Sequence, residues 1–200
     1  MNLLHEPMHR AIWRGRVMRP WRRHQFAGFG PDSILDRPEW IYGAHHIEIG
    51  EGVVFLRGAR LSAEKQTWDE PGPSIVVGPG TMFRTFAVIS ASTRVEIGAN
   101  VLAGSYVSII DSDHTITDGW HNPLFNPVLS SRVTVGECSW LGERATVLRG
   151  TTIGKKCIVA AHSVVRGEVP DFSVVAGAPA RVVGSTRPPG ESHAPEPAHI

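Results

Sequence analysis

Aliphatic side chains recur at every sixth position between residues 133 and 170 of this 200-residue chain. The six positions are Val135, Leu141, Val147, Ile153, Val159 and Val165. A helix would repeat its apolar positions about every 3.6 residues and a half-buried strand about every two, so neither element explains a period of six. A solenoid explains it, because three short strands joined by three corners make a coil of about 18 residues with one large aliphatic side chain inward on each face.

Small residues and glycines accompany the aliphatic ones. A further inward candidate comes four positions after each aliphatic residue, and these candidates are Ser139, Ala145, Thr151, Cys157, Ser163 and Val169. Glycine directly follows the aliphatic residue at Gly136, Gly142 and Gly154, and we expect it to permit the tight or positive-φ backbone that a corner needs. Because one coil cannot bury its own inward face, the coils must stack, which predicts an all-β fold.

One phrase opens each run of turns: HIEIGEGV from His46, SIVVGPGT from Ser74, RVEIGANV from Arg94 and RVTVGECS from Arg132. We therefore expect the solenoid over residues 46–183, with loops at residues 63–73 and 111–131 that leave it. Residues 1–45 should form a short helical or irregular cap, because terminal repeats need covering. A membrane-surface or polyanion-binding role is the alternative for the basic residues 1–24. Residues 184–200 hold four prolines and no periodic apolar residues, and should be a disordered tail.

The composition limits the classes of function. A formal net charge of +1 argues against a dedicated nucleic-acid binder, and no apolar run reaches the ~18 residues of a transmembrane segment. The basic N-terminus lacks the apolar region of a signal peptide, so we expect a cytoplasmic protein. Cys138 and Cys157 are the only cysteines, which argues against a disulfide framework and for a reducing compartment. We interpret both cysteines as structural.

His114 is the first candidate for chemistry, because it lies in an insertion of the solenoid with Asp111 and Asp113 beside it. An imidazole titrates near neutrality and can take a proton from a hydroxyl group as that group attacks. A carboxylate or a backbone carbonyl would fix its tautomer, and the sequence leaves both open. Taken alone, a histidine in a loop is more often a solvated surface residue. His121, in the same insertion, is a second candidate base, an acceptor contact or a residue without a role.

Three stretches resemble the hexapeptide-repeat acetyltransferases, including those that act on maltose, galactosides and polysaccharides. The stretches are EIGANVLAGSYVSIIDSDH, ECSWLGERATVLRGTTIGKKCIVAAHSVV and VVAGAPARVV, all within residues 46–183. The resemblance implies a left-handed parallel β-helix, a triangular solenoid of hexapeptide repeats, whereas the period alone leaves the hand open. It further implies an acyltransferase that uses acetyl-coenzyme A as co-substrate and assembles as a homotrimer.

The same resemblance implies roles for particular residues. His114 would be the general base that deprotonates a hydroxyl of a sugar or polysaccharide precursor, and no metal ion takes part. The coenzyme would lie in a groove between neighbouring subunits. Six residues would line this groove: Trp140 and Gly142 at the acetyl and pantetheine end, Ala160 and Ala161 along the pantetheine arm, and Arg166 and Arg181 at the nucleotide phosphates.

The chain also departs from these enzymes. Arg166 and Gly167 replace a frequent Thr-Lys pair, and His162 replaces a glycine. Phe86 stands where the maltose and galactoside enzymes carry an asparagine before the histidine. The acceptor of those enzymes is therefore not transferred to this chain.

Two other functions share this fold. A non-catalytic structural or assembly β-helix would not bind acetyl-coenzyme A, so the coenzyme would not raise its melting temperature. A metalloenzyme of the γ-carbonic anhydrase kind would need three histidines that converge on zinc across a subunit interface. The histidines considered for such a site lack the paired spacing of that family, and they are His45, His46, His114, His121 and His162.

Overall fold

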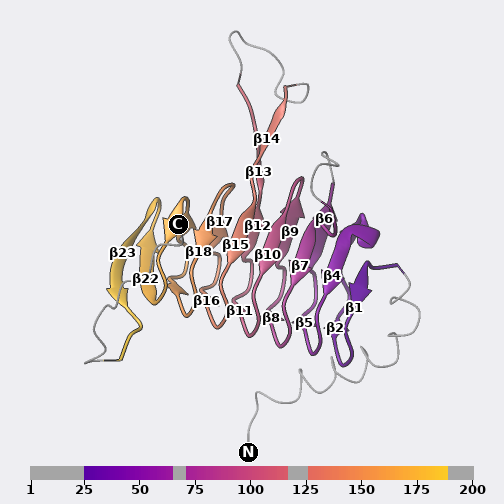
Figure 1. Cartoon of the computed structure of the whole chain (residues 1–200), viewed down its shortest axis with the longest axis horizontal. Helices are drawn as coiled ribbons and strands as arrows, with labels where there is room; N and C mark the ends of the chain where they lie inside the picture. Colours follow the sequence, from indigo (N-terminus) through magenta and orange to yellow (C-terminus); the bar gives the residue numbers. More distant parts are fainter. Residues whose placement is uncertain (1–24, 65–70, 117–125, 189–200) are drawn as a thin grey trace, which may run out of the picture.

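The computed structural model describes residues 25–64, 71–116 and 126–188, which wind into a column with three faces (Figure 1). Each face is a parallel sheet, and every turn of the chain adds one strand to each face in order. The expected triangular parallel β-helix is therefore confirmed. Among the described residues, no helix is long and apolar enough to cross a membrane.

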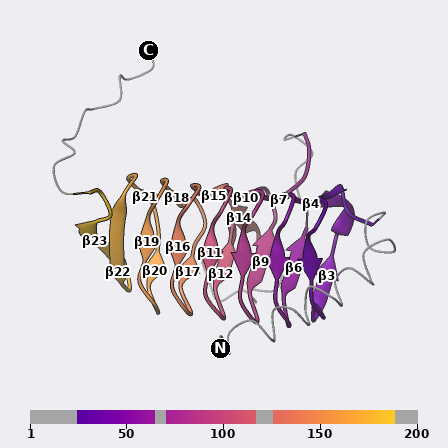
Figure 2. The ribbon, with the colours of Figure 1, turned by 90° about the horizontal axis from the view of Figure 1, so that it is seen from below.

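The three faces are defined by their strands. The first face holds seven: β1 (Gly28–Phe29), β4 (Ile47–Ile49), β7 (Ile75–Val77), β10 (Val95–Ile97), β15 (Val133–Val135), β18 (Thr152–Ile153) and β21 (Glu168–Val169). The second holds eight: β2 (Ile34–Leu35), β5 (Val54–Phe55), β8 (Met82–Phe83), β11 (Leu102–Ala103), β16 (Trp140–Leu141), β19 (Ile158–Val159), β22 (Ser173–Gly177) and the antiparallel β23 (Ala180–Ser185). The third holds six, side by side in Figure 2: β3 (Trp40–Tyr42), β6 (Arg60–Ala63), β9 (Val88–Ala91), β12 (Ser108–Ile110), β17 (Thr146–Val147) and β20 (Val164–Val165).

The residues spaced by six form the core. All six positions from Val135 to Val165 are at most 1% exposed, and the small residues four positions later are buried with them. Each large side chain stacks on its equivalent in the next coil, as Val135 does on Ile153. In the earlier coils the rings of Phe55 and Phe83 stack with centroids 4.5 Å apart. Burial of one such side chain stabilises the fold by about 1.5–3 kcal/mol, so the coils support one another.

The corner glycines have a different role from the one expected. The positive φ lies two residues later, at Cys138 (57°) and Arg144 (58°), whereas Gly136 and Gly142 have no positive φ. A glycine occupies position 136 for a steric reason. A Cβ atom there would lie 2.4 Å from the carbonyl carbon of Gly154 in the next coil. Glycine is therefore required by the close stacking of main chains and not by the backbone conformation.

The solenoid begins before the boundary expected at residue 46. β1, β2 and β3 pair in parallel with β4, β5 and β6, so residues 28–42 form the first coil. Phe29, Leu35 and Ile41 keep the six-residue spacing and pack on the core, although the phrase that opens the later coils is absent. At the other end β23 continues to Ser185. Residues 1–24 and 189–200, most of the expected cap and tail, lie outside the described residues.

We name each edge of the column by the two faces it joins, in chain order. Residues 136–139 lie at the first–second edge, residues 142–145 at the second–third edge and residues 148–151 at the third–first edge. Both insertions leave the third–first edge, one between β6 and β7 and one between β12 and β15. The second is a hairpin of β13 (Ser112–His114) and β14 (Val128–Ser130), which projects from the column in Figure 1. Residues 65–70 and 117–125, including His121, lie outside the described residues.

Candidate active site

His114 ends β13, on the hairpin that projects from the third–first edge. Its backbone pairs with Val128 of β14, and its side chain is exposed. Just beyond it the two strands remain tied, because the Thr115 hydroxyl donates to the Pro127 carbonyl at 2.7 Å and the Asn126 amide donates to the Thr115 carbonyl at 2.7 Å. An ordered arm therefore presents the imidazole to the outside of the column.

Asp111 fastens the base of this arm. Its side chain is fully buried and accepts three backbone N–H groups, from Ser92 at 2.7 Å, Thr93 at 2.7 Å and Arg94 at 2.8 Å. Burial raises the pKa of the Asp111 carboxyl, while the three donors favour its ionised form. The carboxylate thus serves the turn before β10, and among the described residues no hydrogen bond joins it to the imidazole of His114.

Asp113 braces the arm against the coils that follow. Its carboxylate accepts a hydrogen bond from Nε of Arg149 at 3.0 Å and lies 3.5 Å from Nη2 of Arg166. Arg149 follows β17 and Arg166 follows β20, so both arginines reach Asp113 from the third–first edge. Arg166, which was expected near the nucleotide phosphates, therefore lies on the same edge as His114.

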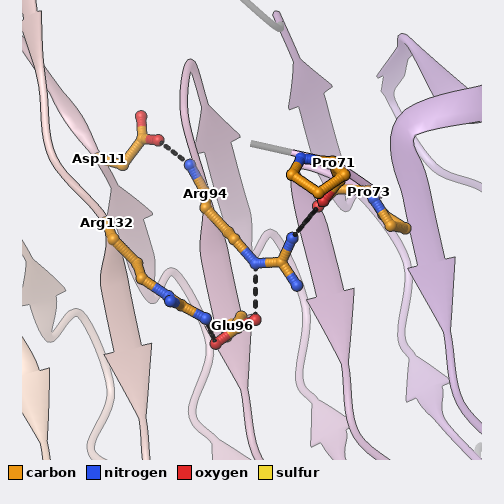
Figure 3. A network of polar contacts seen from close by, with 6 residues as sticks. All are labelled: Pro71, Pro73, Arg94, Glu96, Asp111 and Arg132. Atoms are coloured by element: carbon orange, nitrogen blue, oxygen red, sulfur yellow. Dashed lines mark hydrogen bonds and ion pairs between the residues drawn. The ribbon is translucent and has the colours of Figure 1, made fainter. Parts of the chain in front are cut away.

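A second polar network joins the two insertions across β10 (Figure 3). Arg94, whose N–H binds Asp111, donates Nε to Glu96 at 2.6 Å and Nη1 to the Pro73 carbonyl at 3.2 Å. Arg132, directly after the hairpin, forms an ion pair with the same Glu96. Burial alone would raise the pKa of Glu96, but the hydrogen bonds from Arg132 and Arg94 outweigh it and lower that pKa. Both ends of the hairpin and the end of the first insertion are thus held to one strand.

Trp140 lies on the second face, away from this arm. It belongs to β16, is half exposed and stands between Leu102 and Ile158 of the neighbouring strands. A groove of about 490 Å³ lies beside it, and the groove is lined by Cys138, Trp140, Lys156, Cys157, Ile158, Phe172, Thr186 and Pro188. The indole is available to a ligand that lies along this face.

Gly142, Ala160 and Ala161 meet at the second–third edge. The Gly142 N–H donates to the Val159 carbonyl at 2.8 Å, and a Cβ atom at Gly142 would lie 2.5 Å from the Ala161 nitrogen. These three residues therefore form a narrow strip of main chain and methyl groups on this edge, which suits a thin ligand arm. Arg181 is exposed in the last strand, β23, where its guanidinium donates to the Ala180 carbonyl at 2.8 Å.

One copy of the chain does not bring all the predicted site residues together. His114 and Arg166 lie at the third–first edge, and Trp140 lies on the second face, which is opposite that edge in a three-sided column. The small-residue strip lies at a different edge again, on the Trp140 side. Among the described residues no group of three or more His, Cys, Asp or Glu side chains could hold a metal ion.

Only Cys157 has the buried placement expected of a structural cysteine. Cys157 is buried, and burial raises the pKa of its thiol, which disfavours the thiolate that a nucleophile needs. Cys138 is exposed at the first–second edge, and neither cysteine is in a disulfide.

The anchoring roles of Asp111 and Arg149 were not predicted from the sequence. A signal for Asp111 was present, because Leu61 and Ile89 are each followed two positions later by a buried alanine, whereas Ile109 is followed there by an aspartate. A charged group in an inward position needs partners, and the turn before β10 provides them. The sequence around Arg149 shows no comparable departure from the repeat that would have indicated its role.

Comparison with known proteins now identifies the family. Residues 132–167 match the model described as "Bacterial transferase hexapeptide (six repeats)". The "Putative lipopolysaccharide biosynthesis O-acetyl transferase WbbJ" of Escherichia coli (strain K12) is 40% identical over 157 residues, which are 75% of this chain and 77% of that protein. The chain belongs to the hexapeptide-repeat acetyltransferase family.

Two further members of this family are similar to the chain. The "Probable acetyltransferase Rv3034c" of Mycobacterium tuberculosis (strain ATCC 25618 / H37Rv) is 36% identical over 64% of the chain, and the match spans only 41% of that longer relative. A solved structure of a galactoside acetyltransferase in complex with coenzyme A matches with a TM-score of 0.52 and 25% identity, over 63% of this chain and 65% of the other.

Family membership confirms four expectations drawn from the sequence. These are the hexapeptide-repeat acetyltransferase family itself, the left-handed hand of the β-helix, the acyltransferase class and acetyl-coenzyme A as co-substrate.

Proposed function

We propose that this acetyltransferase moves the acetyl group of acetyl-coenzyme A to a hydroxyl of a saccharide, with His114 as general base. The observation that carries the proposal is the ordered arm, clasped by Asp111 and braced by Asp113, which presents an exposed imidazole outside the column. The relatives named for lipopolysaccharide and galactoside O-acetylation support a saccharide hydroxyl as the acceptor.

The reaction needs one base and no covalent enzyme intermediate. A nitrogen of His114 accepts the proton of the acceptor hydroxyl while the oxygen attacks the thioester carbonyl carbon. A backbone N–H stabilises the negative charge on the carbonyl oxygen. The carbon–sulfur bond then breaks, the imidazolium returns the proton to the departing thiolate, and the products are an acetyl ester and coenzyme A.

The active site lies between two copies of the chain. His114 of one copy would face the second face of its neighbour, where Trp140 and the strip of Gly142, Ala160 and Ala161 would hold the acetyl and pantetheine end. Arg181 of that neighbour and Arg166 on the His114 edge would approach the nucleotide phosphates. This arrangement agrees with the separation of these residues within a single column.

The proposed assembly is a homotrimer, which an apolar ladder on the second face supports. The second face carries a ladder of outward apolar residues in register, namely Val54, Met82, Leu102, Trp140, Ile158 and Val174. Such a ladder favours contact with another surface. When the edge of one copy meets the face of the next, the contact is heterologous, and three copies of a three-sided column close the ring.

Substitution of the base tests the proposal. We expect His114→Ala to lower kcat for acetyl transfer to a saccharide panel by about 10²–10⁴-fold, the usual contribution of a positioned acid–base group. The readouts are release of the coenzyme A thiol and formation of the O-acetyl ester, which NMR detects. Because His114 is exposed, the melting temperature and the affinity for acetyl-coenzyme A should stay unchanged. Near-normal turnover by the variant would rule out His114 as the base.

A further inference from the structure

Four side chains stack on one another along the second–third edge. The guanidinium of Arg57 lies 5.8 Å from the ring centre of Phe86, and the rings of Phe86 and Tyr106 stack 5.1 Å apart at 14°. The guanidinium of Arg144 lies 5.3 Å above Tyr106. We call Arg57, Phe86, Tyr106 and Arg144 the arginine–aromatic column. Each neighbouring pair is in cation–π or stacking geometry, so the four side chains form one continuous surface feature.

The arginine–aromatic column follows the turns of the solenoid. The N–H groups of Phe86, Tyr106 and Arg144 each donate to a carbonyl of the preceding coil at 2.9–3.0 Å. All three residues have φ near +60°. A bulky residue adopts this conformation less favourably than a glycine or an asparagine does. The chain keeps large side chains here despite that cost.

The absence of a side chain at Gly58 allows the arginine–aromatic column to form. A Cβ atom at Gly58 would lie 2.4 Å from the ring of Phe86, so this ring lies flat on the main chain of the coil before it. The ring edges and the two guanidinium groups are left to define the outer surface. Tyr106 is 46% exposed, and Arg57 and Arg144 are exposed as well.

In the part of the chain that the structure describes, the two guanidinium groups of the arginine–aromatic column have no carboxylate partner. Within residues 25–64, 71–116 and 126–188, neither Arg57 nor Arg144 has a carboxylate at ion-pair distance, whereas Arg60, Arg94, Arg132 and Arg149 each have one. A guanidinium that is exposed and without a carboxylate partner is suited to bind a phosphate with two parallel hydrogen bonds.

The position of the arginine–aromatic column relative to the acetyl group indicates which ligand this feature binds. This step rests on the proposed function. The coenzyme arm would follow the edge from Gly142 towards Ala160 and Ala161, with the acetyl group at the Gly142 end. Arg144 follows Gly142 by two residues, and Tyr106 and Phe86 continue the same edge in the opposite direction. We infer that the arginine–aromatic column is the acceptor site, and that the acceptor is a saccharide that carries a phosphate group.

A matched pair of sugars tests this inference. Isothermal titration of the full chain, saturated with coenzyme A, would compare glucose 1-phosphate with methyl α-glucoside, which has the same ring without the phosphate. We expect glucose 1-phosphate to bind at least about tenfold more tightly, since one charge-assisted contact contributes a factor of this size. The double variant Arg57→Gln and Arg144→Gln should lose that advantage while its affinity for coenzyme A stays the same.

Arg187→Gln is the matched control. It removes a guanidinium that lies 4.5 Å above Phe172, a residue of similar backbone conformation at the first–second edge, and it should leave both titrations unchanged. Circular dichroism and the melting temperature of each variant establish that the fold is retained.

Four outcomes would overturn the inference: no binding of glucose 1-phosphate, equal binding of the two sugars, unchanged affinity in the double variant, or an equal loss of coenzyme A affinity. The last outcome would assign the column to the coenzyme phosphates. Failure of the proposed function is distinguishable, because it would appear as near-normal turnover of His114→Ala, a result that does not depend on which of the two sugars binds.

Discussion

At the scale of single residues, proton transfer and anchoring fall on different side chains. His114 is exposed, while Asp111 and Asp113 beside it are engaged with a backbone turn and with Arg149. Neither carboxylate is a partner of the imidazole among the described residues. Substitutions of the anchoring residues should therefore act through the position of the arm and leave coenzyme binding intact.

Arg149→Gln tests this division. The substitution removes the 3.0 Å contact with Asp113 and leaves only the longer one to Arg166. We expect kcat to fall by about tenfold, because a catalytic group displaced by about 1 Å loses this much or more. Steady-state kinetics should show an unchanged KM for acetyl-coenzyme A and an unchanged shape of the pH–rate profile, since the base itself is still present.

Lys155→Gln is the control for this measurement. It breaks a surface ion pair with Glu137 at 3.3 Å, on the first–second edge, and should leave kcat unaltered. An equal fall of kcat in both variants, or none in Arg149→Gln, would mean that the brace does not position His114.

At the scale of elements, the hairpin depends on a buried carboxylate. Asp111→Ala would leave the N–H groups of Ser92, Thr93 and Arg94 without their acceptor, and the free energy of unfolding should fall by about 1–3 kcal/mol. Denaturant titration measures this fall. Amide hydrogen exchange at these three residues should become faster, while exchange in β15 to β20 should keep its rate. Asp111→Asn keeps one carbonyl oxygen as an acceptor. Its free energy of unfolding should therefore lie between those of the unsubstituted protein and Asp111→Ala. Unchanged exchange at residues 92–94 in Asp111→Ala would contradict the clasp.

The elements of the column could be predicted because each coil repeats the same local rule. The spacing from Val135 to Val165 identified the inward positions directly. The first coil was missed because Phe29, Leu35 and Ile41 keep the spacing without the phrase that opens the other coils. The reason for glycine at position 136 was not predictable, because its constraint comes from Gly154, a neighbour in space that a single repeat does not contain.

At the scale of the whole molecule, the candidate site was only partly predictable. His114 was singled out because it stands in an insertion, and the small-residue strip because the family resemblance implies it; the roles of both stay predictions. The three-dimensional arrangement was needed to show that His114 and the strip lie on different edges of one column. Arg166 illustrates the point, because its contact with Asp113 joins residues 53 positions apart.

Subunit complementation tests the central claim, that His114 of one copy works with the strip of another. His114→Ala removes the base, and Ala161→Trp fills the strip, so each variant alone should be inactive. In trimers assembled at random from equal amounts of both, about a quarter of the sites would combine two intact halves. Thiol release from acetyl-coenzyme A should then recover to about a quarter of the activity of the unsubstituted protein. Mixed trimers that form, as native mass spectrometry would show, but stay inactive would contradict a site shared between copies.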